Sequence, residues 1–194
     1  QQPINFEYSL ELENRQIWFI ASIAPTSENT VVWVARDISD RVLAEAAQKR
    51  RATMDRLLGD ISRAFLDQDI DTAIDFTLSK IGEYTESDRS YITRFYEQQR
   101  YLSMTHEWCA KTAFPQTELV QEIPVETFPW MYEQLLLGKT VLIDDVDNLP
   151  IQAVADKIAL NRLSTRSLIN IPLLHRNQLV GCIGLVTAYA AKQW

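Results

Sequence analysis

One alternating stretch near the middle of the chain carries side chains that could bind a small molecule. In RYLSMTHEWC, the alternation typical of a strand places four side chains on one face: Leu102, Met104, His106 and Trp108. Such a face could contact an apolar or aromatic ligand, and Trp130 and Met131 could line the same pocket from a facing helix. The alternative is that the His is buried with its hydrogen bonds satisfied and that the Met and aromatic side chains only fill a core.

The two cysteines and a group of acids are the other candidates for chemistry. Cys109 lies at a strand end on the parity opposite to Trp108, and Cys182 lies in the middle of a predicted strand, which is a packing position. Thiol redox catalysis needs a nucleophile and a resolving partner, and neither cysteine has an evident one. Three acids (Asp144, Asp145 and Asp147) follow a strand into a turn without a His ligand, so a solvated loop is preferred to a metal site.

No catalytic arrangement is recognised, because the chain has no Gly-rich phosphate loop, Ser-His-Asp set or paired carboxylates at a suitable spacing. The sequence therefore predicts no catalytic residue and no metal, and it leaves the cofactor unknown. Two cysteines far apart form no disulfide framework, which is consistent with a reducing cytoplasm.

The distribution of charge along the chain narrows the classes of partner that it could bind. The 194 residues carry a net charge of -7. Residues 41–66 have six basic and three acidic side chains, so -7 minus +3 leaves -10 on the remainder. This balance disfavours nucleic acid and anionic membranes as main partners. No apolar run approaches the ~18 residues of a membrane span.

The elements downstream of residue 52 are expected to position the candidate pocket. They follow the order helix, helix, strand, strand, helix, strand, helix, strand, strand, which predicts an α+β fold with a central antiparallel sheet flanked by helices. The stretches that identify a family are HEWC (106–109), PW (129–130), LGK (137–139), IDDV (143–146), LP (149–150), SLINIPL (167–173) and LVGCIG (179–184).

Together these stretches resemble a GAF domain over roughly residues 52–194, similar to GAF domains of bacterial, cyanobacterial-like multi-sensor signalling proteins. The resemblance implies a cavity between the sheet and the loop-helices. It also implies that the usual final helix after a Trp such as Trp194 is missing from this sequence.

Residues 6–36 are expected to form three short strands that lead into a long helix. They close on VARDISDR (34–41), which resembles the end of a PAS domain, where an Asp-Ile-Thr/Ser-acid-Arg segment enters a signalling helix. Residues 1–37 are therefore interpreted as the C-terminal strands of a PAS domain. The helical half that forms the wall of a PAS ligand pocket is absent from the sequence.

The long helix is expected over about 37–66, with 38–66 acting as a linker that continues into the first helix of the next domain. A heptad stripe predicts a parallel homodimer through this helix. The stripe consists of Leu43, Ala47, Arg50, Met54, Leu57, Ile61 and Ala64. The alternative is the first helix of the downstream domain preceded by a solvated linker.

The resemblance implies a sensory, non-enzymatic module whose parent protein is a histidine kinase; the alternative parent is a diguanylate cyclase. Some GAF domains bind bilins through a thioether or reduce free methionine sulfoxide. The chain departs from both, because no Cys-His pair follows in the helices and Cys109 lacks a second thiol. The expectation is a cytoplasmic homodimer that passes a conformational bias to an output domain. It either binds a small apolar or aromatic ligand or, with its cavity filled by its own side chains, only mediates dimerisation.

Overall fold

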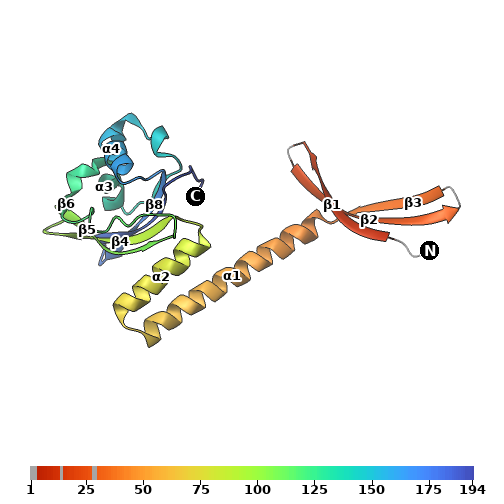
Figure 1. Ribbon diagram of the computed structural model, residues 1–194, viewed down its shortest axis with the longest axis horizontal. Coiled ribbons are helices and arrows are strands. Elements are labelled where there is room, and N and C mark those ends of the chain that lie inside the picture. Colours follow the sequence, from red (N-terminus) through yellow and green to blue (C-terminus); the bar gives the residue numbers. More distant parts are fainter. Residues whose placement is uncertain (1–3, 14, 28–29) are drawn as a thin grey trace. The chain divides into compact units, whose positions relative to one another are not determined.

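The computed structural model describes residues 4–13, 15–27 and 30–194. The chain divides into two compact units, Gln1–Gly59 and Asp60–Trp194. Parts of the segment 1–37, namely residues 1–3, 14 and 28–29, lie outside the described residues. Figure 1 labels the elements of both units.

The first unit begins with a three-stranded antiparallel sheet. Its strands are β1 (Ile4–Leu12), β2 (Arg15–Ser27) and β3 (Thr30–Asp37), in the order β1-β2-β3. Aromatic side chains gather across it: the ring centroids of Tyr8 and Phe19 lie 5.5 Å apart, and Trp33 lies 6.4 Å from both Phe6 and Tyr8. Such cross-strand aromatic pairs are a main source of sheet stability.

Helix α1 (Ser39–Asp67) begins directly after β3. The Asp37 carboxylate accepts a hydrogen bond from the Ser39 backbone N–H at 2.8 Å, as expected of a residue that caps a helix start. The Ser39 hydroxyl in turn accepts from the Trp18 N–H at 2.9 Å, and Arg41 pairs with Glu7 on β1. These contacts fix the start of α1 on its sheet.

Only part of the heptad stripe of α1 is exposed to solvent. Leu43, Ala47, Arg50 and Met54 are exposed. Ala64 is 5% exposed because the end of α1 packs within the second unit. The expectation that Ala64 contributes to a dimer seam is therefore wrong: its side chain is already covered in the single chain.

The second unit is built on a six-stranded antiparallel sheet in the order β6-β5-β4-β9-β8-β7. The strands are β4 (Arg89–Tyr96), β5 (Tyr101–Cys109), β6 (Ile123–Pro124), β7 (Val141–Ile143), β8 (Ser167–His175) and β9 (Gln178–Thr187). Sequential hairpins bring β4 and β5 together and β8 and β9 together, and the pairing of β4 with β9 joins the two hairpins.

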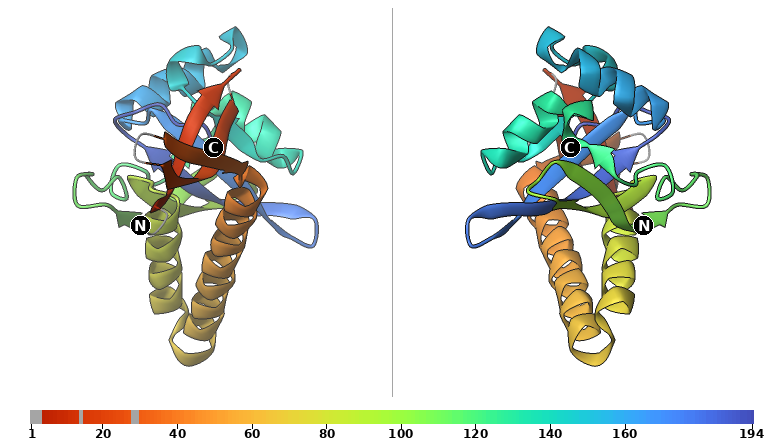
Figure 2. Two further views of the ribbon diagram at one scale, coloured as in Figure 1. Left: turned by 90° about the vertical axis from the view of Figure 1, so that its right-hand side faces the viewer. Right: turned by 90° about the vertical axis from the view of Figure 1, so that its left-hand side faces the viewer.

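Helices cover both faces of this sheet. Helix α2 (Ile70–Tyr84) packs against β4 and β5, and its start is capped by Asp69, which accepts from the Thr72 N–H at 3.0 Å. Helices α3 (Pro129–Leu136) and α4 (Val154–Arg162) form a helical layer on the opposite face (Figure 2). Short 3₁₀ turns precede them at Val125–Thr127, Val146–Asn148 and Ile151–Ala153.

The predicted α+β fold with a central antiparallel sheet flanked by helices is confirmed. The main core lies between the sheet and the helical layer, where Leu168, Val141 and Val146 are almost fully buried. Among the described helices, none is both long and apolar enough to cross a membrane.

Candidate functional site

A cavity lies between the sheet and the helical layer. The centre of a water molecule can occupy about 70 Å³ of it, which is room for several waters or one compact organic molecule. Most of its wall is apolar and comes from both layers: Phe95, Leu102, Met104, Val120, Phe128, Met131, Leu135, Leu160, Leu163 and Val186. The cavity is therefore suited to a small molecule with an apolar body.

Arg89 contributes a positive charge to the wall of this cavity. Arg89 is the first residue of β4 and is only 3% exposed. Its guanidinium Nη2 donates to the backbone oxygens of Leu163 (2.8 Å) and Ser164 (3.0 Å). No carboxylate of the described residues lies within 4 Å of it as an ion pair. Arg89 thus connects the cavity to the turn that follows α4.

Glu107 faces the same cavity from β5. Its Oε2 accepts from the backbone N–H groups of Gln116 (2.7 Å) and Thr117 (2.9 Å) and from the Thr117 hydroxyl (2.7 Å). Its Oε1 and the side-chain oxygen of Gln116 are buried and have no hydrogen-bond partner among the described residues. Because buried acceptors are normally satisfied, these two oxygens indicate where a bound molecule or water would donate.

Tyr91 and Asn170 form a second polar contact in the wall. The Tyr91 hydroxyl donates to Asn170 Oδ1 at 2.9 Å, and burial is the main reason that the pKa of Tyr91 is raised. A β-carbon on Gly184 would overlap both side chains, so only glycine leaves room for this pair. The neutral phenol and the amide therefore contribute polarity without charge.

Cys182 also lines the cavity, with its sulfur 3.0 Å from the Thr93 hydroxyl. Burial raises the pKa of the Cys182 thiol to about 11. At the end of β5, burial and then the Glu107 charge raise the pKa of Cys109 to about 11. Both thiols are free, and a raised pKa keeps a thiol protonated and unreactive at neutral pH.

The two helices of the helical layer are joined by Asp156. This α4 side chain is fully buried, and its carboxylate accepts from the backbone N–H groups of Trp130 (3.1 Å) and Met131 (2.9 Å) at the start of α3. It therefore supplies the cap that α3 lacks in its own sequence, where Phe128 makes no side-chain capping bond.

The expectation for His106 and Trp108 is wrong. A β-bulge at Thr105 sets Met104 opposite Thr93 but His106 opposite Ile92, and the extra residue reverses the parity of the strand. His106 Nε2 consequently lies 3.3 Å from Asp71 Oδ1 on α2. The Trp108 ring lies against α2 at Gly82, where a β-carbon would overlap it.

The other candidate positions divide as follows. Met104 and Met131 line the cavity, whereas Trp130 is only partly buried against the core and does not line it. Sequence reasoning missed the polar residues of the wall: Arg89, Tyr91, Glu107, Gln116 and Asn170. The alternation of β4, in which Arg89 and Tyr91 share a parity with Phe95, was an available signal for the first two.

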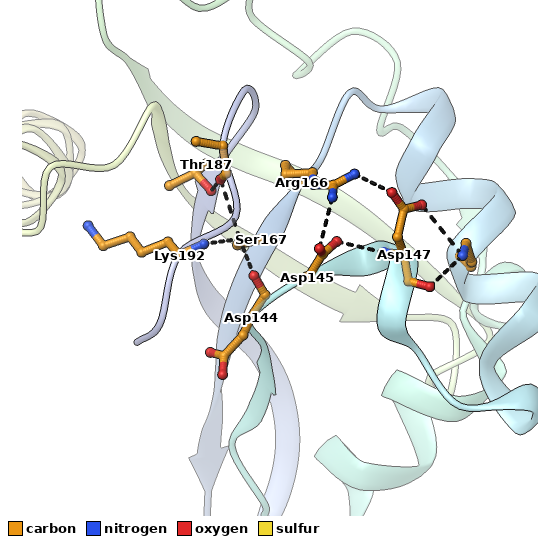
Figure 3. Close-up of polar contacts among 9 residues, drawn as sticks. Asp144, Asp145, Asp147, Arg166, Ser167, Thr187 and Lys192 are labelled. Carbon is orange, nitrogen blue, oxygen red and sulfur yellow. Dashed lines mark hydrogen bonds and ion pairs between the residues drawn. The ribbon is translucent and has the colours of Figure 1, made fainter.

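Two of the acids after β7, Asp145 and Asp147, form ion pairs. Figure 3 shows Arg166 between Asp145 and Asp147. Its Nη2 lies 2.8 Å from Asp145 Oδ2 and its Nη1 pairs with Asp147, which also contacts Lys157. The Arg166 hydrogen bond is the main reason that the pKa of Asp147 is lowered. No group of side chains suited to a metal ion occurs among the described residues.

The residue after Arg166 ties the C-terminal segment to the sheet. The Ser167 hydroxyl donates to the Asp144 backbone oxygen at 2.6 Å and accepts from the Lys192 N–H at 2.7 Å (Figure 3). Arg89, Arg166 and Ser167 therefore connect the cavity, the α4–β8 turn and residues 188–194 through neighbouring hydrogen bonds.

Solved structures share this fold at low identity. GAF3 of Slr1393 from Synechocystis sp. PCC6803, in its photoproduct state, is 19% identical with a TM-score of 0.52, covering 61% of this chain and 77% of that one. The far-red absorbing dark state of JSC1_58120g3 with bound biliverdin IXa is 14% identical with a TM-score of 0.60, covering 73% and 86%. The chromophore-binding domain of Stigmatella aurantiaca phytochrome P1 is 12% identical with a TM-score of 0.58, covering 96% and 66%.

No curated protein matches the chain. The GAF domain model matches residues 69–194, which is more than half of the chain and contains the whole sheet and cavity. The chain therefore belongs to the GAF domain family.

Proposed function

We propose that the second unit is a ligand-binding sensory module, and that a small, mainly apolar or aromatic molecule occupies the cavity between the sheet and the helical layer. The observation that carries this proposal is the combination of an apolar wall with buried acceptors that no described residue satisfies. A cavity filled only by its own side chains would leave neither the space nor the unpaired oxygens.

The contacts of Arg89 support a route from the cavity to the C-terminal segment. Its guanidinium donates to the backbone oxygens of Leu163 and Ser164. A little further along the chain, Arg166 donates to Asp145 after β7, and the Ser167 hydroxyl accepts from the Lys192 backbone N–H. A ligand that favours one position of Arg89 would favour one arrangement of this turn and of residues 188–194. Differential binding of this kind is what a sensor needs in order to shift an equilibrium.

The proposed context is a cytoplasmic signalling protein with no catalytic role for this part of the chain. Its parent is a multi-sensor histidine kinase, with a diguanylate cyclase as the alternative. The three strands before α1 are the end of a PAS domain, and the parallel homodimer forms through α1. The exposed side chains Leu43, Arg50 and Met54 support the dimer.

The similarity to a biliverdin-bound structure raises the question of a bilin. We expect no covalent attachment at Cys109, because burial raises the pKa of this thiol to about 11 and a thiol, unlike a thiolate, is a poor nucleophile. Protein co-expressed with bilin should therefore be colourless. A zinc-fluorescent band at the mass of the chain after denaturing electrophoresis would contradict this.

Native mass spectrometry of freshly purified protein tests the proposed function. Wild type should retain a small-molecule mass or gain one from a fragment mixture. Leu160→Phe, which places a larger ring in the cavity, should lose it. The matched control Ile158→Phe, on the half-exposed outer side of α4, should keep it. Equal retention by the two variants would place the ligand elsewhere, and no bound mass under any condition would refute the proposal.

A further inference from the structure

The two oxygens of Glu107 have different environments. Three donors of the 116–117 segment converge on Oε2, at 2.7 to 2.9 Å. Oε1 is buried and accepts no N–H or O–H hydrogen bond from the described residues. A hydrogen bond to the Glu107 carboxylate also contributes to the raised pKa of Cys109, but a thiol S–H is only a weak donor. Rotating the carboxylate by half a turn changes nothing, because its two oxygens are equivalent. One oxygen still accepts from the three donors, and the other still lacks an N–H or O–H donor. Glu107 therefore presents a fixed acceptor in the cavity wall.

Gln116 is more adaptable than Glu107. Its side-chain oxygen is also buried without a partner among the described residues. A rotation of the amide by half a turn exchanges oxygen and NH₂, so this residue can present an acceptor or a donor. Glu107 alone thus determines which kind of group the cavity prefers at this position.

The charges in the cavity wall determine which kind of donor group is favoured. The Arg89 guanidinium and the Glu107 carboxylate both line the cavity. At Tyr91 in the same wall, the Arg89 charge lowers the pKa and the Glu107 charge raises it, so the two charges oppose each other there. An ammonium group would gain from Glu107 but be repelled by Arg89, and a carboxylate would meet the reverse. A neutral N–H or O–H group satisfies the acceptor without this conflict, and the apolar wall covers the rest of the molecule.

From these observations we infer that the ligand is a compact, neutral, mainly apolar molecule that donates one N–H or O–H hydrogen bond to Glu107 Oε1. The inference rests on the proposed function and narrows it to a ligand class. A donor placed there relieves an unsatisfied buried acceptor, whereas a molecule with only an acceptor adds a second one.

Two size-matched probe pairs test this class. Indole and benzofuran differ in having N–H or O at the same ring position, as do the smaller pyrrole and furan. Titration calorimetry and thermal shift on wild type should show that the N–H member of at least one pair binds about tenfold more tightly than its oxygen counterpart, the scale of one buried hydrogen bond.

Glu107→Gln is the decisive variant. Its amide oxygen should stay with the three donors of residues 116–117, which turns the NH₂ group toward the cavity. The preference should then disappear or reverse in favour of benzofuran. The matched control Glu118→Gln, on an exposed position of the same segment, should keep the wild-type preference.

The outcomes separate the two proposals. Equal binding of the N–H and oxygen members of both pairs to wild type, or tighter binding of benzoate than of indole, would overturn the inferred class and leave a ligand-binding cavity in place. Failure of all these probes, together with no bound mass in native spectra, would overturn the proposed function as well. Wild-type selectivity decides the matter even if Glu107→Gln does not fold.

Discussion

Removing the Asp156 carboxylate should loosen the helical layer above the cavity more than any surface change. Its two oxygens accept the first two N–H groups of α3 that follow Pro129, at 3.1 and 2.9 Å. The side chain is fully buried, so water cannot replace these bonds without entering the core. Asp156→Ala leaves both N–H groups unpaired, and Asp156→Asn keeps one oxygen and removes the charge.

The magnitude follows from these two bonds. A hydrogen bond to a charged group is worth about 1.5–3 kcal/mol, so the pair is worth about 3–6 kcal/mol before the cost of burying the carboxylate. That cost is substantial, because burial raises the pKa of Asp156 despite both bonds. We therefore expect Asp156→Ala to lower the free energy of unfolding by about 2–4 kcal/mol, and Asp156→Asn by about 1–2 kcal/mol.

The pH dependence has a definite sign. The pKa of Asp156 in the folded protein is raised above its ordinary value of 3.8, so the native state binds the proton more tightly than the unfolded state. The contribution of Asp156 to the free energy of unfolding is therefore full below pH 3.8, and part of it is lost as the pH rises through the folded pKa. The difference in free energy of unfolding between wild type and Asp156→Asn should therefore become smaller as the pH rises from 3.8 through the folded pKa.

Urea unfolding followed by circular dichroism at several pH values measures both effects. Asp75→Ala, an exposed position on α2, serves as the matched control. Ordinary surface substitutions change the free energy of unfolding by up to about 0.5 kcal/mol. If Asp156→Ala changed it by no more than this, the capping role would be refuted. A gap to Asp156→Asn that widens with rising pH would refute the electrostatic reasoning.

Three further substitutions probe other parts of the chain. Gly82→Ala should destabilise the second unit by about 1–2 kcal/mol in urea unfolding, because its methyl group overlaps Trp108; unchanged stability would contradict the packing. Arg50→Leu should tighten dimerisation in sedimentation equilibrium by about 1–2 kcal/mol, because it removes a charge from the stripe; a monomer in both proteins would argue against the α1 dimer. Arg166→Gln should lower the melting temperature at neutral pH but not in strong acid, since the lowered pKa of Asp147 stabilises the fold only above that pKa and is lost as the pH falls through it; a difference that persists in acid would show that the ion pair is not the cause.

Local patterns predicted most of the elements correctly. Asp69 caps α2 as its type and position suggest, and Pro129 begins α3 where its missing N–H costs nothing. The alternation of β8 and β9 around Arg176–Asn177 is typical of a hairpin, and the two strands pair as one. These features depend on neighbours in sequence, which is why they can be read without the fold.

The site was harder to predict because it depends on a single irregularity. The bulge at Thr105 moves His106 and Trp108 to the α2 face and brings Glu107 into the cavity. No residue type marks this position, because the bulge follows from how β5 pairs with β4. Met104 lies before the bulge, so simple alternation still places it correctly. Gln116 and Asn170 come from distant segments that only the fold brings together.

The three methionines allow the most direct test of ligand binding in the cavity. Met104 and Met131 line the cavity, whereas Met54 is 40% exposed on α1 and belongs to the other unit. Selective ¹³C labelling of the methionine methyl groups gives three signals, assigned by Met→Leu substitution. Titration with indole should shift the Met104 and Met131 signals together along one saturating curve and leave Met54 unchanged. Signals of Met104 and Met131 that stay fixed while Met54 moves, or while the probe demonstrably binds, would contradict a ligand site between the sheet and the helical layer.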